Sequence, residues 1–158
     1  MATLEQAIAF AAKQHAGQVD KANAPYILHP LRVMLNVPSI EHKIIAVLHD
    51  VLEDTETSIE DLQALGFQPH IIEAIVALTK RKGESRIQAA QRTVQNPLAR
   101  VVKLADINDN MDLSRISSPT SKDFERLNEY KQVRDILIQN VYPSRLYCFN
   151  LMTRNWSL

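Results

Sequence analysis

The sequence predicts an all-α protein that folds as one compact domain. Apolar residues recur at intervals of three and four along most of the chain, and no run of alternating strands is present. The length of 158 residues is usual for one domain, and a hydrophobic content of 46% is enough to bury a core. Only three glycines are present, too few for a Gly-rich dinucleotide turn or a phosphate-binding P-loop. We therefore expect a single helical domain over residues 1–158.

Local capping signals set the expected helix boundaries. Capping boxes are predicted at Thr3 with Gln6 and at Thr57 with Glu60, and Pro30 suits the first position of a short helix. Glycines and later prolines end or restart the pattern. In chain order, the expected helices cover residues 3–16, residues 31–36, a segment from Ser39 through His49, Thr57 to Gly66, Pro69 to Lys80, Ser85 to Asn96, Leu98 to Leu113, and a last long segment after Pro119.

Composition argues against several classes of protein. Eighteen Lys plus Arg balance eighteen Asp plus Glu, so we expect neither a nucleic-acid nor a membrane partner. The short basic cluster at residues 80–82 is most simply a solvated helix end, with the steering of an anionic substrate as the alternative. The N-terminus has no signal-peptide pattern, and a single cysteine, Cys148, suits a reducing compartment. These features predict a cytoplasmic protein whose oligomeric state the sequence does not define.

The stretch AVLHDVLEDTE, residues 46–56, concentrates groups that handle metals and protons. On a continuous helix, His49 would stack with Glu53 and Asp50 with Asp54, because residues four apart lie on one face. Apolar neighbours would place these groups against a core, where metal coordination is the usual compensation for burying charge. The alternative is a solvated acidic helix end.

Two further segments can complete a metal site. His29 lies in a turn-like segment just before Pro30, which can hold its imidazole in one orientation. Asp106 interrupts an otherwise apolar helix. Together with His49 and Asp50, they form a set of two histidines and two aspartates. This mixed set suits manganese, iron or zinc, and an open coordination position would make the site catalytic.

The order of these residues resembles the four-ligand signature of the HD superfamily of metal-dependent phosphohydrolases, whose fold is helical. The flanking segments are more specific and cover residues 4–138. They resemble the hydrolase domain of the RelA/SpoT group and the small alarmone hydrolases. The matching segments are His15-Ala-Gly-Gln18 with Lys21, residues 25–30, residues 48–55, and Val102-Lys-Leu-Ala-Asp106 with Asn110.

This resemblance implies removal of the 3′-pyrophosphate from guanosine tetra- or pentaphosphate, a small phosphorylated nucleotide. It also implies Mn2+ as the metal, with another divalent transition metal as the alternative. Carried over position by position, the implied metal ligands are His29, His49, Asp50 and Asp106, the catalytic acids are Glu53 and Asp54, and the substrate-binding residues are Lys21, Asn110 and Tyr130. For Tyr130, a core position is an equally good interpretation, because its hydroxyl needs a partner in either case.

One position departs from the family pattern. Asp20 stands where relatives commonly carry an arginine that contacts the base, and a carboxylate cannot supply a cationic stacking plane. Two alternatives therefore stay open: a phosphohydrolase for another phosphorylated nucleotide or metabolite, and a non-catalytic nucleotide sensor. Among the other histidines, we expect His15 to be a packing or hydrogen-bonded residue, and His42 and His70 to lie at the surface.

Overall fold

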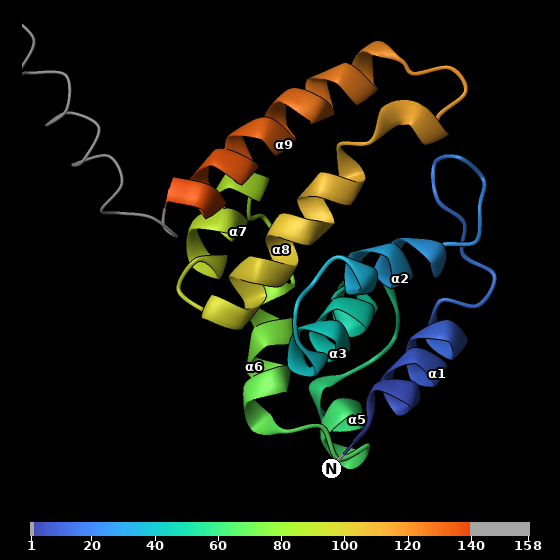
Figure 1. Cartoon of the computed structure of the whole chain (residues 1–158), viewed down its shortest axis with the longest axis vertical. Helices are drawn as coiled ribbons and strands as arrows, with labels where there is room; N and C mark the ends of the chain where they lie inside the picture. Colours follow the sequence, from blue (N-terminus) through green and yellow to red (C-terminus); the bar gives the residue numbers. More distant parts are fainter. Residues whose placement is uncertain (1, 140–158) are drawn as a thin grey trace, which may run out of the picture.

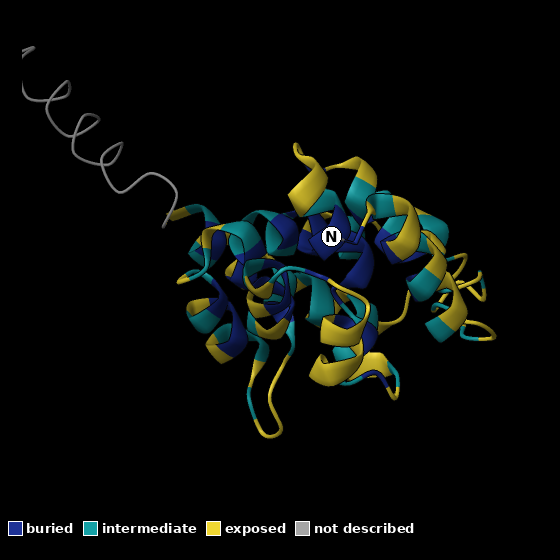
Figure 2. Ribbon diagram, turned by 90° about the horizontal axis from the view of Figure 1, so that it is seen from below, coloured by how far each residue is buried: buried dark blue, intermediate teal, exposed yellow. Residues whose placement is uncertain are grey.

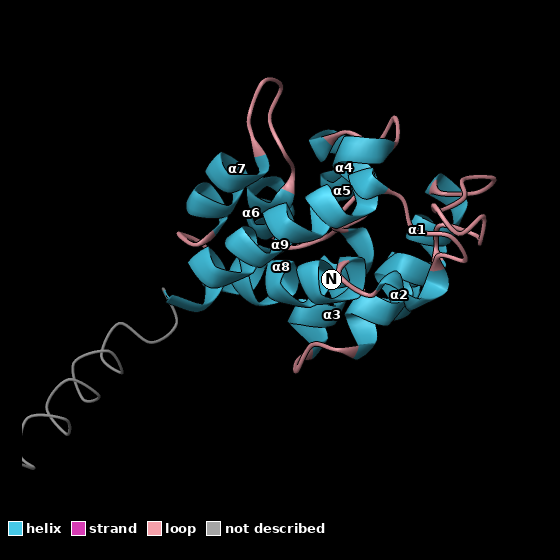
Figure 3. Ribbon diagram, turned by 90° about the horizontal axis from the view of Figure 1, so that it is seen from above, coloured by secondary structure: helices cyan, strands magenta, loops and turns pink. Residues whose placement is uncertain are grey.

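The computed structural model describes residues 2–139, and within this range the regular structure is helical (Figure 3). The only strand-like pairing there is an isolated bridge between Val19 and Pro25. The α-helices are α1 (Leu4–Gln14), α2 (Leu28–Leu35), α3 (Ile40–Leu48), α4 (Val51–Asp54), α5 (Ile59–Ala64), α6 (Pro69–Leu78), α7 (Arg86–Thr93), α8 (Pro97–Asn110) and α9 (Ser121–Gln139). The all-α prediction is confirmed. Cys148 lies outside the described residues.

The helices form two groups that share α8 (Figure 1). Helix α3 packs against α1, α2, α6 and α8, helices α2 and α6 also pack against α8, and the buried side chains of this group form the main core. Helices α7 and α9 pack against the other side of α8, where Ala90, Ile107, Val133 and Leu137 form a smaller cluster. Buried residues follow the inner faces of both groups (Figure 2). Helix α8 is therefore the element on which both groups converge.

Several predicted boundaries are confirmed by their hydrogen bonds. The Thr3 hydroxyl accepts from the Gln6 backbone N–H, and the Gln6 side chain accepts from the Thr3 backbone N–H, so the capping box starts α1. Pro69 occupies the first turn of α6, where its missing N–H needs no partner. Ser85 caps α7 as expected. None of the helices within residues 2–139 is long and apolar enough to cross a membrane.

Other predicted boundaries are wrong. Helix α2 begins at Leu28 rather than at Pro30, because a proline is tolerated anywhere in the first turn, where N–H groups have no helical partner. The capping box of α5 is formed by Ser58 with Asp61, one residue later than predicted. Helix α8 ends at Asn110, and the chain continues into the short 3-10 helix η1 (Leu113–Arg115).

The helix expected to run through His49 also ends earlier. Helix α3 stops at Leu48, Asp50 adopts φ −103° and ψ −4°, and the single turn α4 follows. The His49 side chain contributes to this ending, because its Nδ1 lies 2.6 Å from the carbonyl oxygen of Ala46 and occupies an acceptor of the last turn. The predicted stacking of His49 with Glu53 along one continuous helix is therefore wrong. The backbone N–H of Asp54 still bonds to the Asp50 carbonyl at 2.9 Å.

Candidate metal centre

The structure brings four of the predicted residues together from three helices. His29 Nε2 lies 3.2 Å from Asp106 Oδ1 and 3.8 Å from Asp50 Oδ2. His49 Nε2 lies 2.9 Å from Asp50 Oδ2 and 3.7 Å from Asp106 Oδ1. Each imidazole therefore faces both carboxylates. Helix α2 supplies the first histidine, the end of α3 supplies the His49-Asp50 pair, and α8 supplies Asp106.

Both histidines are oriented by the nitrogen that points away from this cluster. His49 Nδ1 donates to the Ala46 carbonyl at 2.6 Å, and His29 Nδ1 donates to Asp109 Oδ2 at 2.7 Å. These bonds place a proton on each Nδ1, so the Nε2 of the neutral imidazole directs its lone pair toward the carboxylates. His49 Nε2 is buried and has no hydrogen-bond partner of good geometry, although Asp50 is near. A buried acceptor without a partner fits a metal ligand.

Asp106 is buried and held by its own helix. Lys103 Nζ donates to Asp106 Oδ2 at 2.9 Å, and Asn110 Nδ2 donates to Asp106 Oδ1 at 2.5 Å. One carboxylate oxygen therefore meets an ammonium group, while the other turns toward the two histidines. The Asn110 amide, predicted to bind substrate, is engaged with Asp106 in this structure.

The electrostatics of the cluster keep its carboxylates ionised. Burial alone would lower the pKa of His29, but its hydrogen bonds to Asp106 and Asp109 raise this pKa to about 9. Burial alone would raise the pKa of Asp50, but the adjacent His49 holds this pKa at about 2. The carboxylates of Asp50 and Asp106 therefore favour a positive charge beside them, which a protonated imidazole can supply. A divalent cation would take over this role, because an imidazole must be neutral to ligate.

The donor set fits a transition metal. His29, His49 and Asp50 each offer one ligand atom, and these atoms lie within 4.8 Å of one another. Asp106 Oδ1 lies 3.2 and 3.7 Å from the Nε2 atoms of His29 and His49. Two imidazole nitrogens with carboxylate oxygens suit manganese, iron or zinc rather than calcium. The residues present therefore fit a bound divalent cation.

Glu53 and Asp54 lie at the mouth of the cluster rather than in the core. Both residues are exposed, so the expectation that they pack against apolar neighbours is wrong. Glu53 Oε2 accepts the backbone N–H of Lys80 at 2.9 Å, which links α4 to the loop after α6. Burial of part of the side chain and the charges of Asp50 and Glu53 raise the pKa of Asp54. Asp54 also lies 3.3 Å from the hydroxyl of Tyr26.

Known proteins with similar sequences identify the family. The guanosine-3′,5′-bis(diphosphate) 3′-pyrophosphohydrolase MESH1 of Homo sapiens is 32% identical over 143 residues, which are 82% of this chain and 79% of that protein. The MESH1 protein of Drosophila melanogaster is 30% identical over 139 residues, which are 79% of this chain and 76% of that protein. The chain belongs to this pyrophosphohydrolase family.

Further comparisons agree with this assignment. A pyrophosphohydrolase from Aquifex aeolicus is 31% identical over 120 residues, or 68% of this chain, but these residues are only 17% of that longer protein. A solved structure, described as a metazoan ortholog of SpoT that hydrolyzes ppGpp, superposes with a TM-score of 0.70 at 26% identity. The superposition covers 89% of this chain and 85% of the solved chain. No family model matches the chain.

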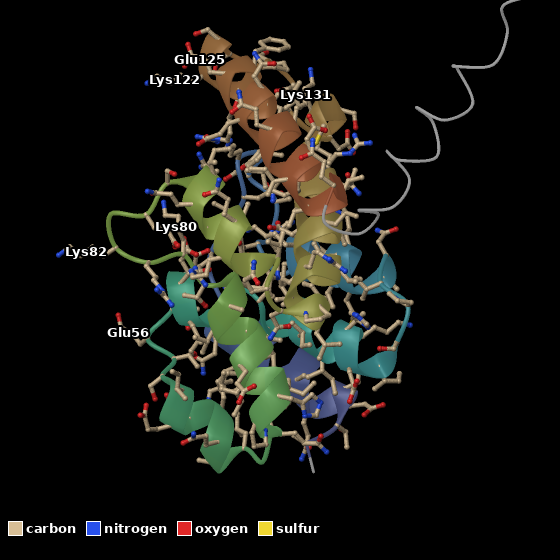
Figure 4. The ribbon with its side chains drawn as sticks, turned by 90° about the vertical axis from the view of Figure 1, so that its left-hand side faces the viewer. Glu56, Lys80, Lys82, Lys122, Glu125 and Lys131 are labelled. Atoms are coloured by element: carbon tan, nitrogen blue, oxygen red, sulfur yellow. The ribbon has the colours of Figure 1, made fainter. Side chains whose placement is uncertain are left out.

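The cluster of two histidines and two aspartates lies in a pocket of about 370 Å³. The pocket lies between the two helix groups, so its wall combines residues from α2, α4, α7, α8 and α9. Acidic groups gather around the predicted metal ligands, and basic groups line the wall. The basic lining residues are Lys21, Arg32, Lys80, Arg86, Lys103, Arg115 and Arg126. Lys82, from the predicted basic cluster, extends outward on the loop between α6 and α7 (Figure 4).

The other predicted binding residues also line this pocket. Lys21 Nζ pairs with Asp123 Oδ1 at 3.4 Å, which connects the loop after α1 to the start of α9. Tyr130 is half-buried, packs against the smaller core cluster and lines the pocket, so its core contacts are confirmed and a substrate contact stays a prediction. Burial raises the pKa of Tyr130, and the guanidinium of Arg86 lies 5.5 Å from its ring centroid.

Asp20 has a structural role in its own loop. Its Oδ1 accepts the backbone N–H groups of Ala22 and Ala24 at 2.9 and 3.0 Å. The carboxylate therefore closes the turn between α1 and α2, where Asn23 adopts a positive φ of 61°. Asp20 nevertheless lines the pocket, so its charge lies near any ligand bound there.

Sequence reasoning missed Asp109, which organises one wall of the site. Its carboxylate accepts from His29, from Arg32 Nε at 2.8 Å and from Arg115 Nη1 at 3.2 Å. A signal was present, because Asp109 follows Asp106 by three residues and shares its helix face. Its arginine partners could not be found from spacing, since Arg32 lies on another helix.

The remaining histidines are placed as expected or nearly so. His15 is buried at the end of α1, and its Nδ1 lies 2.7 Å from Gln18 Oε1, which confirms a hydrogen-bonded packing role. His70 is partly exposed and contacts Glu41 at 3.0 Å. His42 is half-buried and hydrogen-bonded to Ser39.

Proposed function

We propose that this chain removes the 3′-pyrophosphate from guanosine tetra- or pentaphosphate in a metal-dependent hydrolysis. The observation that carries the proposal is the convergence of two oriented imidazoles on one buried and one half-buried carboxylate inside a basic-lined pocket. The substrate follows from the names of the relatives, which are pyrophosphohydrolases of guanosine-3′,5′-bis(diphosphate). The cytoplasm is the proposed location, as the single cysteine suggests.

We assign the metal to His29, His49, Asp50 and Asp106, with Mn2+ as the proposed ion. The Nδ1 hydrogen bonds of the two histidines support this assignment, because they fix the tautomer that ligation requires. A bound divalent cation would supply a Lewis acid that activates water at neutral pH and neutralises charge on the phosphoryl oxygens.

Glu53 and Asp54 are proposed to handle protons during the reaction. Both carboxylates reach the pocket from a single helical turn, next to Asp50. The pKa of Asp54 is raised by partial burial and by the charges of Asp50 and Glu53, which favours a role in proton transfer. The contact of Glu53 with the Lys80 backbone holds its carboxylate at the pocket mouth.

Lys21, Asn110 and Tyr130 are proposed to bind the nucleotide. They come from three segments that surround the pocket, so one ligand can contact all of them. An ammonium group suits a phosphate, and an aromatic ring suits the face of a sugar or base. Because Lys21 is already paired with Asp123, a bound phosphate would have to compete with that carboxylate.

A second candidate substrate is another phosphorylated nucleotide. The position of Asp20 favours it, because this side chain keeps a negative charge at the pocket where relatives carry an arginine. A nucleobase other than guanine, or fewer phosphate groups, would then be better tolerated. The chemistry at the metal-binding residues would be unchanged.

A substrate panel tests these alternatives. Purified Mn-loaded protein is incubated with guanosine tetraphosphate, its adenosine counterpart and other nucleotides, and the products are separated by anion-exchange chromatography. Equal amounts of GDP and pyrophosphate from guanosine tetraphosphate are the expected result. Turnover of a different nucleotide alone would replace this substrate with the second candidate. Binding without turnover of any nucleotide would indicate a sensor.

A further inference from the structure

One aromatic residue joins the two acidic groups of the site. Tyr26 lies in the segment between α1 and α2, and its hydroxyl donates to Asp50 Oδ2 at 2.5 Å. The same hydroxyl lies 3.3 Å from Asp54 Oδ2. A phenol has one proton, so the shorter contact to Asp50 receives it, and the contact to Asp54 is the weaker one.

The carboxylate oxygen that Tyr26 contacts is the one that faces the histidines. Asp50 Oδ2 is also the atom that lies 2.9 Å from His49 Nε2 and 3.8 Å from His29 Nε2. A carboxylate oxygen has two lone pairs, so it can accept from a hydroxyl and still ligate a cation. The hydroxyl therefore fixes the direction in which Asp50 presents this oxygen.

Tyr26 is itself held in place by aromatic neighbours. Its ring centroid lies 4.9 Å from that of His15 and 5.8 Å from that of His29. Gln18 bonds to His15 and also donates its amide to the Asp54 backbone carbonyl at 2.8 Å. The His15-Ala-Gly-Gln18 segment thus contacts the Tyr26 ring through His15 and the Asp54 backbone through Gln18.

We propose that Tyr26 is a positioning residue that fixes Asp50 for metal binding and keeps Asp54 beside it. The role in turnover rests on the proposed function, but the role in metal binding does not. The His15–Gln18 segment then has a supporting role, because it holds the Tyr26 ring, whose hydroxyl contacts both carboxylates.

The substitution Tyr26→Phe tests this role, because it keeps the ring and its aromatic contacts and removes only the hydroxyl. Thr93→Val is the matched control, since Thr93 does not line the pocket and the substitution deletes a buried hydroxyl, which bonds to the carbonyls of Ala77 and Ala89. Mn2+ affinity is measured by calorimetric titration of the metal-free proteins, and thermal unfolding verifies that both variants fold. The expected loss of affinity is about 10- to 100-fold for Tyr26→Phe, with wild-type affinity for Thr93→Val.

The two readouts separate this inference from the proposed substrate. A change in Mn2+ affinity smaller than about threefold relative to Thr93→Val would overturn the metal-positioning role, whether or not guanosine tetraphosphate is hydrolysed. On whichever nucleotide is turned over, Tyr26→Phe should lower kcat and leave KM unchanged. A raised KM with unchanged kcat would instead make Tyr26 a substrate contact and would overturn the positioning role in turnover.

Discussion

The imidazole of His29 is fixed by Asp109, a residue eighty positions later in the chain, through a 2.7 Å hydrogen bond from Nδ1 to Oδ2. This bond turns Nε2 toward Asp106 Oδ1, which is 3.2 Å away. Asp109 in turn is held by two arginines, so α2, α8 and the segment after α8 meet at one carboxylate. The direction of one proposed metal ligand therefore depends on a residue that is not itself a ligand.

The first prediction concerns this bond. Asp109→Asn keeps the shape of the side chain but removes the charge that fixes the histidine, so Mn2+ affinity should fall about 10- to 100-fold. Calorimetric titration measures the affinity. Asp61→Asn is the control, because Asp61 only completes the capping box of α5. Equal Mn2+ affinity for Asp109→Asn and wild type would show that His29 is oriented without Asp109.

The second prediction assigns proton transfer to the acidic pair. Glu53→Gln and Asp54→Asn keep the size of each side chain and remove its basicity, so kcat should fall about 100-fold or more while metal content stays at the wild-type level. Elemental analysis and steady-state kinetics provide the two measurements. Glu56→Gln is the control, since Glu56 is exposed on the same segment and points away from the helices (Figure 4). Wild-type turnover in both variants would rule out the acid–base role.

The third prediction separates the charge of Asp20 from its structural role. Asp20→Asn removes the charge but keeps an oxygen that can accept from Ala22 and Ala24. The KM for guanosine tetraphosphate should then fall about 2- to 5-fold, because an exposed charge pair is worth about 0.5–1 kcal/mol. The kcat should not change. Steady-state kinetics measures both constants, and an unchanged KM would mean that the substrate does not sense this carboxylate.

The fourth prediction concerns stability against acid. Hydrogen bonds from Arg92 and from the Arg81 backbone lower the pKa of Glu84 from 4.5 to about 2. A carboxyl whose folded pKa is depressed stabilises the protein above its unfolded pKa and loses that contribution as the pH falls toward the folded value. The free energy of unfolding of wild type should therefore exceed that of Glu84→Gln by about 1–2 kcal/mol at pH 6. This difference should shrink as the pH falls from 4.5 to about 2.

Denaturant unfolding at several pH values measures this difference. The proposed metal ligands contribute the same pH dependence to the unfolding free energy of wild type and of Glu84→Gln. This contribution cancels when the two proteins are compared. A stability difference that stays constant from pH 6 to pH 2 would contradict the role of the Glu84–Arg92 pair, which ties the loop between α6 and α7 to α7.

Local signals account for what the sequence predicts well. The capping box at Thr3 and the proline that opens α6 act within one helical turn, so their hydrogen bonds can be inferred from spacing alone. The cluster of His29, His49-Asp50 and Asp106 was also predictable, because ionisable residues in apolar segments are costly to bury unless they meet a partner or a metal.

Side-chain contacts that the pattern of apolar residues does not encode account for what the sequence does not predict. One of them is local: the His49 side chain contacts the Ala46 carbonyl at the break between α3 and α4, which the 3.6-residue period does not reveal. The link from Tyr26 to Asp50 joins residues 24 positions apart. Such contacts depend on how helices pack, and the pattern of apolar residues does not determine them.

The most direct test of the central claim is the metal content of wild type, His49→Ala and Asp106→Ala, measured together with hydrolysis of guanosine tetraphosphate. We expect one divalent cation per wild-type chain, and loss of both metal and turnover in each variant, because removing one of four ligands weakens binding severely. Circular dichroism establishes that the variants remain folded. A folded variant that keeps full metal occupancy, or that hydrolyses the nucleotide at the wild-type rate, would contradict the assignment of this cluster as the catalytic metal centre.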